Sequence, residues 1–177
     1  KYDGNSFSAF NESNGLPNNY LRAIAVAPDG VLWVGTRQGI ALIDSGKVKP
    51  PPFSELTIPS ISDILFTKDN RVVVCTFGWG IYTINEGLVE RFTTESGLQS
   101  DHVRCVVELT NSELWFGAKE GLSKFEKGEF RVLKEEQGLQ YSNVKILGED
   151  REGNLWIGTD GKGILLQYTP HIYHALE

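Results

Sequence analysis

Apolar residues recur along this chain in a pattern that repeats about every forty residues. Trp33, Trp115 and Trp156 lie in nearly identical phrases, VLWVGT, ELWFGA and NLWIGT. Trp115 and Trp156 are 41 residues apart, and Trp33 precedes Trp115 by twice that spacing, so a further copy is expected between them. It lies at residues 71–76, RVVVCT, where Val73 takes the place of the tryptophan. The chain therefore contains four repeats.

Other positions keep the same register in all four repeats. An apolar residue precedes each tryptophan-like position by twelve residues, at Leu21, Ile61, Val103 and Val144. A glycine with an aliphatic neighbour follows each, at Gly39, Gly80, Gly121 and Gly163. Turn-forming residues separate the first two apolar segments, as at 28–30 and 151–154. Each repeat therefore reads as four short strands, expected in the third repeat at 103–109, 113–118, 121–126 and 129–133.

Four antiparallel strands in forty residues are typical of one blade of a β-propeller. The predicted fold class is all-β: about four blades, each a four-stranded antiparallel sheet, forming a partial propeller or half of a larger ring. A blade cannot bury both of its faces alone. We therefore expect the repeated tryptophans and their aliphatic neighbours to fill the space between blades, and the adjacent glycines to allow close packing.

The repeat register also predicts boundaries within this single propeller segment. Residues 1–14 resemble the end of a blade and are expected to be an orphan outer strand, followed by blades at 15–53, 54–92, 93–133 and 134–177. The chain end also reads as a fourth strand, with Tyr173 matching Phe130. Three interpretations stay open: a preceding blade is missing, one end strand displaces the other, or two chains pair into a larger ring as a homodimer.

Composition narrows the classes of partner. The net charge is −6, and no run of Lys or Arg exceeds two residues, which disfavours nucleic acid. The apolar runs are too short for a membrane helix, so no membrane insertion of this segment is expected. Cys75 and Cys105 lie inside apolar runs and are predicted to be buried thiols rather than a disulfide framework.

The segments GLPNNYLRAIAVAPDGVLWVGTRQGIALID (15–44) and GLQYSNVKILGEDREGNLWIGTDGKGILLQY (138–168) resemble the two-component regulator propeller repeat. The second repeat departs from that pattern at Glu55, Val73 and Cys75. The resemblance implies a periplasmic or extracytoplasmic sensor of a bacterial, often hybrid, two-component regulator. Many such sensors detect oligosaccharides, and they usually carry more than four repeats.

Propellers bind ligands mostly at one face of the central channel. The loops there join the second strand to the third, and the fourth strand to the next blade. On this basis the candidate ligand-binding residues are Arg37, Trp79, His102, Lys119, Tyr141, Asp160 and Lys162. Trp79 lies in a Gly-Trp-Gly loop outside the repeated tryptophan column, and an indole can pack on the C–H face of a sugar.

Catalytic, metal and cofactor signals are weak in this sequence. No nucleophile, phosphate-binding or zinc motif is present, so no catalytic residue, metal or cofactor is predicted. The principal hypothesis is a sensor module that binds a small polar ligand or oligosaccharide. One alternative is a protein-interaction scaffold without a small ligand. A second is a propeller lyase, for which only His102, with Glu120 and Lys119 nearby, could serve.

Overall fold

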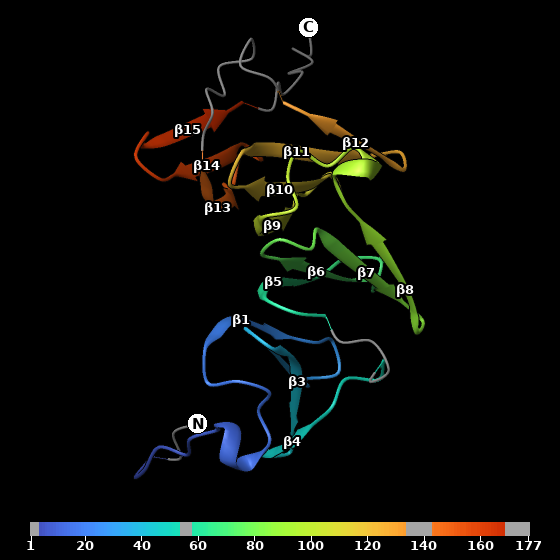
Figure 1. Ribbon diagram of the computed structural model, residues 1–177. Coiled ribbons are helices and arrows are strands. Elements are labelled where there is room, and N and C mark those ends of the chain that lie inside the picture. Colours follow the sequence, from blue (N-terminus) through green and yellow to red (C-terminus); the bar gives the residue numbers. More distant parts are fainter. Residues whose placement is uncertain (1–3, 54–57, 134–142, 169–177) are drawn as a thin grey trace, which may run out of the picture.

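The computed structural model describes residues 4–53, 58–133 and 143–168, and folds them into four antiparallel sheets stacked in chain order (Figure 1). The first sheet contains β1 (Leu21–Val26), β2 (Leu32–Thr36), β3 (Gly39–Asp44) and β4 (Lys47–Lys49). The second contains β5 (Ile61–Phe66), β6 (Val72–Thr76), β7 (Ile81–Asn85) and β8 (Leu88–Phe92). The third contains β9 (Val103–Glu108), β10 (Leu114–Ala118), β11 (Gly121–Glu126) and β12 (Glu129–Val132). The fourth contains β13 (Val144–Glu149), β14 (Leu155–Thr159) and β15 (Ile164–Gln167).

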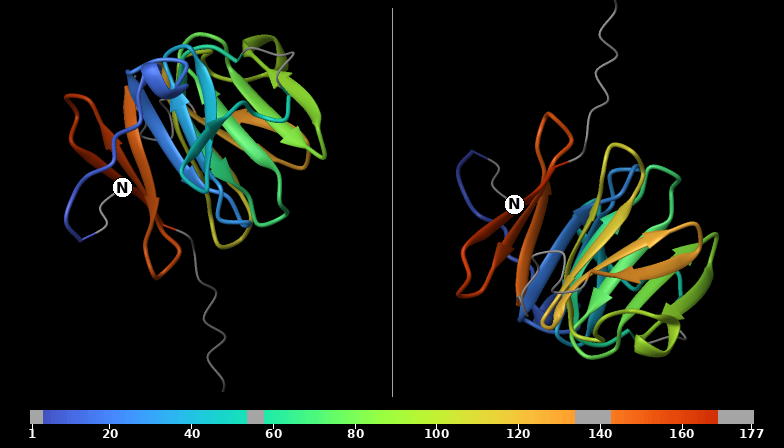
Figure 2. Two further views of the ribbon diagram at one scale, coloured as in Figure 1. Left: turned by 90° about the horizontal axis from the view of Figure 1, so that it is seen from below. Right: turned by 90° about the horizontal axis from the view of Figure 1, so that it is seen from above.

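The prediction of an all-β stack of propeller blades is confirmed. Each sheet is a meander in which consecutive strands pair. The first strands of the blades, β1, β5, β9 and β13, contact one another in sequence and are called the inner strands below. Viewed along the stack, successive sheets lie one over another (Figure 2). Within the described residues no helix is long and apolar enough to cross a membrane.

The tryptophan columns join neighbouring blades, as predicted. Trp33 is buried and packs edge-on against Phe66 of the second blade, with ring centroids 5.5 Å apart. Trp115 is buried in the cluster that joins the third and fourth blades. A Cβ at Gly35 would lie 2.4 Å from Cγ2 of Ile61 in the next blade. The Trp-x-Gly pattern therefore leaves room for the first residue of the following inner strand.

A side-chain hydrogen bond closes the hairpin between the second and third strands of three blades, and it is buried in the first two. The hydroxyl of Thr36 donates to the carbonyl of Gly39 at 2.8 Å, and Thr76 bonds Gly80 in the same way at 2.7 Å. Thr159 and Gly163 repeat the contact in the fourth blade. This threonine ends the repeated phrase and fixes the position of the loop that follows it.

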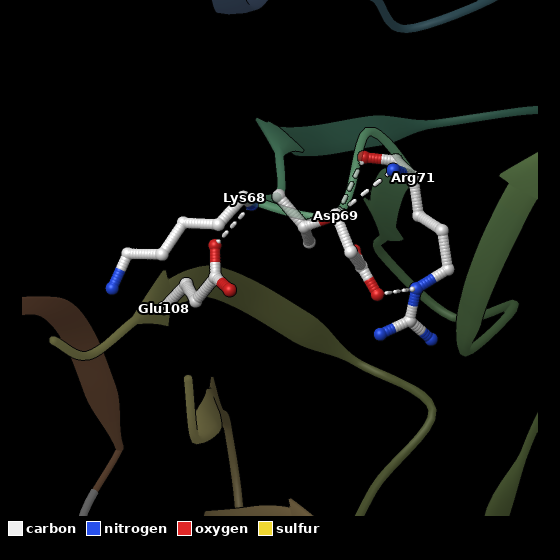
Figure 3. A network of polar contacts seen from close by, with 5 residues as sticks. Lys68, Asp69, Arg71 and Glu108 are labelled. Atoms are coloured by element: carbon white, nitrogen blue, oxygen red, sulfur yellow. Dashed lines mark hydrogen bonds and ion pairs between the residues drawn. The ribbon is translucent and has the colours of Figure 1, made fainter. Parts of the chain in front are cut away.

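Polar contacts made by the turn after the inner strand add to the apolar packing at the second and third junctions. The backbone N–H of Lys68, in the turn after β5, donates to the Glu108 carboxylate at 2.8 Å (Figure 3). The ammonium group of Lys68 donates to the carbonyl of Leu109 at 2.7 Å. One blade later, the N–H of Thr110 donates to Glu149. At the first junction the sequence places Pro28, which has no N–H, where the later turns have Lys68 and Thr110.

The start of the chain is described from residue 4 onward, and its assignment as an orphan outer strand stays a prediction. Phe7 makes a single bridge, and residues Glu12–Asn14 form the 3-10 turn η1. The outer strand of the first blade is β4. Phe10 and Leu16 instead pack on Val34 and Ala41 at the face of the first blade that points away from the second.

The turn η1 has a structural counterpart before the third blade. The turn η2 (Thr94–Ser96) has the same capping box and the same left-handed glycine, Gly97, at its end. Leu98 and Leu16 follow these two turns and are equally buried. Residues 11–16 therefore have the conformation of a connector between blades.

Candidate functional site

One hydrogen bond places the loop between the second and third strands in every blade. The backbone N–H groups of Arg37, Phe77, Lys119 and Asp160 donate to the carbonyls of Tyr20, Ser60, His102 and Asn143, respectively. The four distances lie between 2.8 and 3.1 Å. The loops that carry most of the candidate residues therefore lie along one edge of the four sheets, the edge at which the inner strands begin.

A cavity of about 320 Å³ lies near the first residues of the inner strands. Its lining residues are Arg22, Ser62, Phe77, Arg104 and Lys145, and we call it the inner-strand pocket. Four of the five are the second residues of β1, β5, β9 and β13. Every blade thus contributes the same structural position to one cavity, and three of these four positions carry a cation.

Phe77 lies among the charged groups of the pocket. The guanidinium carbon of Arg22 is 5.7 Å from the centroid of its ring, and that of Arg104 is 5.6 Å away. The His102 imidazole packs on the same ring with a centroid distance of 4.8 Å. Contacts of this length are favourable cation–π and aromatic interactions, so Phe77 holds side chains from three blades together.

The cations of the pocket differ in their partners. Lys145 forms an ion pair of 3.1 Å with Asp160, which also accepts a hydrogen bond from the Asn143 amide. Among the described residues neither Arg22 nor Arg104 has an ion-pair partner, and the buried Nε of Arg104 has no hydrogen-bond acceptor. The hydroxyl of Ser62 donates to the carbonyl of Val103 at 2.6 Å. The two guanidinium groups therefore keep unused donors.

Two of the predicted site residues adjoin the inner-strand pocket. His102 contacts it through Phe77, and Asp160 contacts it through Lys145. Arg37 and Lys119 occupy the same column of the repeat as Phe77, and both are exposed. The Lys119 ammonium is 3.8 Å from Glu120. None of these four side chains is itself a lining residue of the pocket.

The remaining predicted residues lie apart from the pocket or outside the described chain. Trp79 is exposed, and its ring faces the Arg91 guanidinium on the outer strand β8 at 5.5 Å. Lys162 is exposed in the loop before β15. Tyr141 lies outside the described residues. In the Phe-Gly-Trp loop, Phe77 rather than Trp79 lines the pocket.

Sequence reasoning missed the four lining residues of the inner strands and Phe77, although a signal for the cations was present. Arg22, Arg104 and Lys145 each follow the aligned apolar residue that begins an inner strand. Alternation along a strand turns successive side chains to opposite faces, so the residue after a buried position is directed elsewhere. A cation repeated at the second position of three inner strands therefore indicates which side of these strands lines the pocket.

The two cysteines, Glu120 and His102 each lie in defined surroundings within the described residues. Burial raises the pKa of the Cys105 thiol to about 12 and that of Cys75 well above its usual range, so both thiols stay protonated. Both are free and buried, as predicted. Glu120 accepts a short hydrogen bond from Ser100, while the His102 ring stacks on Phe77. No group of three or more His, Cys, Asp or Glu side chains suited to a metal occurs in the described part of the chain.

Comparison with known proteins supports this architecture. The model of the family named two component regulator propeller matches residues 15–38 and 138–161, in the first and fourth blades. No curated protein matches the chain.

Solved structures share the fold at low sequence identity. One is the extracellular domain of a protein named as a hybrid two component system from B. thetaiotaomicron, with a TM-score of 0.80 and 20% identity over 94% of this chain. A second extracellular domain of such a system from the same organism gives a TM-score of 0.72 and 17% identity over 85% of this chain. This chain spans only 24% and 23% of the length of those two domains.

An enzyme shares the fold as well. A catalytically inactive virginiamycin B lyase from Staphylococcus aureus gives a TM-score of 0.63 and 16% identity, over 86% of this chain and 57% of the lyase. At these identities the likeness concerns the fold alone. The repeat itself is the more specific finding, because the family model and the blades coincide. Residues 15–38 of the first blade and residues 138–161 of the fourth therefore match the two-component regulator propeller repeat.

Proposed function

We propose that this chain is part of the extracytoplasmic sensor of a bacterial two-component regulator and binds a small polar ligand, such as an oligosaccharide, in the inner-strand pocket. The family repeat supports the signalling role, and the two extracellular domains with the same fold support the location. The pocket supports ligand binding, because it combines an aromatic ring with several hydrogen-bond donors.

The observation that carries the proposal is that all four blades line a single pocket. A ligand seated there would contact β1, β5, β9 and β13 together. Binding to the folded state alone would therefore stabilise the stack of blades against unfolding, by an amount that grows with ligand concentration. A ligand that contacts all four inner strands could also change the relative positions of the blades, and a sensor needs such a change to transmit a signal.

A direct test compares the two exposed aromatic residues of one loop. A panel of oligosaccharides is screened against the chain by thermal shift, and hits are measured by isothermal titration calorimetry. Phe77→Ala is expected to weaken binding at least tenfold because it removes the ring from the pocket. Trp79→Ala is the matched control and should bind like the wild type. Loss of binding in Trp79→Ala alone would move the site to the outer loop, and no binding by any sugar would count against the sensor role.

The second candidate, a protein-interaction scaffold, is favoured by the apolar residues on the two ends of the stack. Ile24 and Val26 on the first blade, and Ile146 and Ile164 on the fourth, are exposed. Large exposed apolar surfaces mark contacts with other protein. Light scattering separates the two: a stable monomer that binds sugar supports the sensor alone, whereas a dimer near twice 19.7 kDa supports an interaction through these ends.

A further inference from the structure

We propose, on the basis of the function proposed above, that the inner-strand pocket recognises an anionic group of its ligand: a carboxylate or a sulfate carried by an acidic oligosaccharide. The proposal goes beyond polar-ligand binding because it assigns the charge of the ligand and the residues that read it. Arg104 and Arg22 are the primary contacts, and Lys145 is the secondary one.

The charge of the pocket is the first argument. The chain as a whole has a net charge of −6, yet three cations from three different blades line one cavity. Arg22 belongs to β1, Arg104 to β9 and Lys145 to β13. Like charges repel when they are brought together, so this gathering is unfavourable unless an anion offsets it. Asp160 offsets Lys145 at 3.1 Å and leaves the two guanidinium groups uncompensated within the described residues.

The unused donors are the second argument. The Nε of Arg104 is buried and has no acceptor among the described residues. A buried donor without a partner is costly, and native structures normally satisfy such a group with protein, water or a ligand. A guanidinium presents a planar fork of donors that matches the oxygens of a carboxylate or sulfate. An oxyanion in the pocket would satisfy Arg104 at the point where the structure leaves it unpaired.

The position of Phe77 is the third argument. Arg22 and Arg104 come from non-adjacent blades, and both guanidinium carbons lie within 6 Å of the same ring. Packing on an aromatic face restricts the rotamers of a long side chain before any ligand arrives, which lowers the entropic cost of binding. The ring also offers an apolar surface to the C–H face of a sugar. The pocket therefore suits a molecule that joins a pyranose ring to a negative charge.

The test uses four probes with the whole chain in isothermal titration calorimetry at low salt. They are a galacturonic acid trisaccharide, a sulfated disaccharide, a neutral galactose trisaccharide and inorganic sulfate. The acidic sugars are expected to bind at least tenfold more tightly than the neutral sugar, and their affinity should fall as salt rises. The tighter of the two acidic sugars identifies the anion as carboxylate or sulfate. Inorganic sulfate should bind weakly at the same site and compete.

Three variants test the residue assignment. Arg104→Gln should weaken the acidic sugars at least tenfold and leave the neutral sugar unchanged, with Arg22→Gln acting in the same direction. Arg104→Lys keeps the charge without the planar fork and should give an intermediate loss. Arg131→Gln removes an exposed cation from the outer strand β12 and is the matched control. Circular dichroism and the unfolding midpoint establish that each variant is folded.

The failures of the two proposals are distinguishable. Equal affinity for neutral and acidic sugars, unchanged in Arg104→Gln and Arg22→Gln, would overturn the anionic assignment and leave the sensor function standing. Absence of binding for all three sugars would overturn both. If Arg104→Gln does not fold, Arg22→Gln and the salt dependence of the wild type decide the question, and a salt-independent affinity would overturn the assignment.

Discussion

The junctions between blades and the two ends of the stack carry the same residues in very different surroundings. Ile64, in the second blade, has 6% of its surface exposed, whereas Ile24, at the equivalent position of the first blade, has 64% exposed. Trp115 is 3% exposed between the third and fourth blades, and Trp156 is 37% exposed on the free face of the fourth. Identical residue types therefore form a core in one place and a surface in the other.

The glycines show the same contrast in packing. A Cβ at Gly117 would lie 2.4 Å from Val144 of the next blade, whereas a Cβ at Gly158 would meet only Ile146 of its own blade. The repeated pattern thus encodes a contact with a neighbouring blade and not the burial of the residue within its own sheet. The difference shows that the contacts between neighbouring blades supply much of the stability of this architecture. This is expected for repeats that cannot bury a face alone.

The largest predicted difference comes from the two tryptophans. Trp115→Ala should lower the free energy of unfolding by about 3–5 kcal/mol, because it leaves a cavity between two blades. Trp156→Ala should cost about 1 kcal/mol or less, because it removes an exposed ring and one hydrogen bond to Asp150. Urea unfolding followed by circular dichroism measures both. Equal losses would show that the free face of the fourth blade is covered in solution.

The glycine at a junction offers a sharper probe of close packing. Gly117→Ala would place its Cβ 2.4 Å from Val144 and 2.6 Å from the Cys105 sulfur, so we expect a loss of about 1–3 kcal/mol from overpacking. Gly148→Ala is the control on β13, where nothing lies within 4 Å of the added atom. It should change stability by less than about 0.5 kcal/mol. A tolerated Gly117→Ala would contradict the tight junction.

The polar contact between the third and fourth blades should contribute less than the apolar packing. Glu149 accepts hydrogen bonds from the N–H of Thr110 at 2.8 Å and from its hydroxyl at 2.8 Å. Glu149→Ala should therefore cost about 1 kcal/mol in chemical unfolding. Glu90→Ala, on the exposed part of β8, serves as the comparison and should be nearly neutral. A loss in Glu90→Ala as large as that in Glu149→Ala would remove the special role of the junction.

The smallest predicted effects are opposite pH dependences of two carboxyl groups. Burial raises the pKa of Asp63, which accepts a hydrogen bond from the backbone of Val106 across a junction. Its contribution to stability is present below its unfolded pKa near 3.8 and is lost as the pH rises through the higher native value. Burial opposes ionisation of Asp150 too, but hydrogen bonds from Trp156 and Asn154 lower its pKa to about 2.

Asp150 therefore behaves in the reverse sense. Its contribution is present above pH 3.8 and is lost as the pH falls toward 2. Carboxyl titration by NMR should place the two midpoints on opposite sides of the usual aspartate value. Asp63→Asn should flatten the pH dependence of stability above pH 4, and Asp150→Asn should flatten it below. Coinciding midpoints would contradict the difference in environment between the junction and the free blade.

Much of this fold was predictable from the sequence because the same spacing of apolar and turn residues occurs in four consecutive repeats. The spacing of Trp33, Trp115 and Trp156 gave the number of blades, and the pairing of strands followed from the turns between apolar segments. The family model matches residues 15–38 and 138–161, within the first and fourth blades. The assignment of residues 1–14 to an orphan outer strand stays a prediction, because the described part contains one bridge, at Phe7, and the turn η1.

The sequence by itself determined which residues face a neighbouring blade. It also determined that the variable loops, between the second and third strands of each blade, lie along one edge of the sheets. Only the tertiary structure decided that Phe77 lines the pocket while Trp79 turns to Arg91 on β8. The loop contains Gly78 and Gly80, both with positive φ, and its path depends on bonds from their N–H groups to Asp101 of the next blade. A pocket built from one residue per blade exists only once the blades are stacked, because local pattern fixes the direction of each side chain but not what it meets.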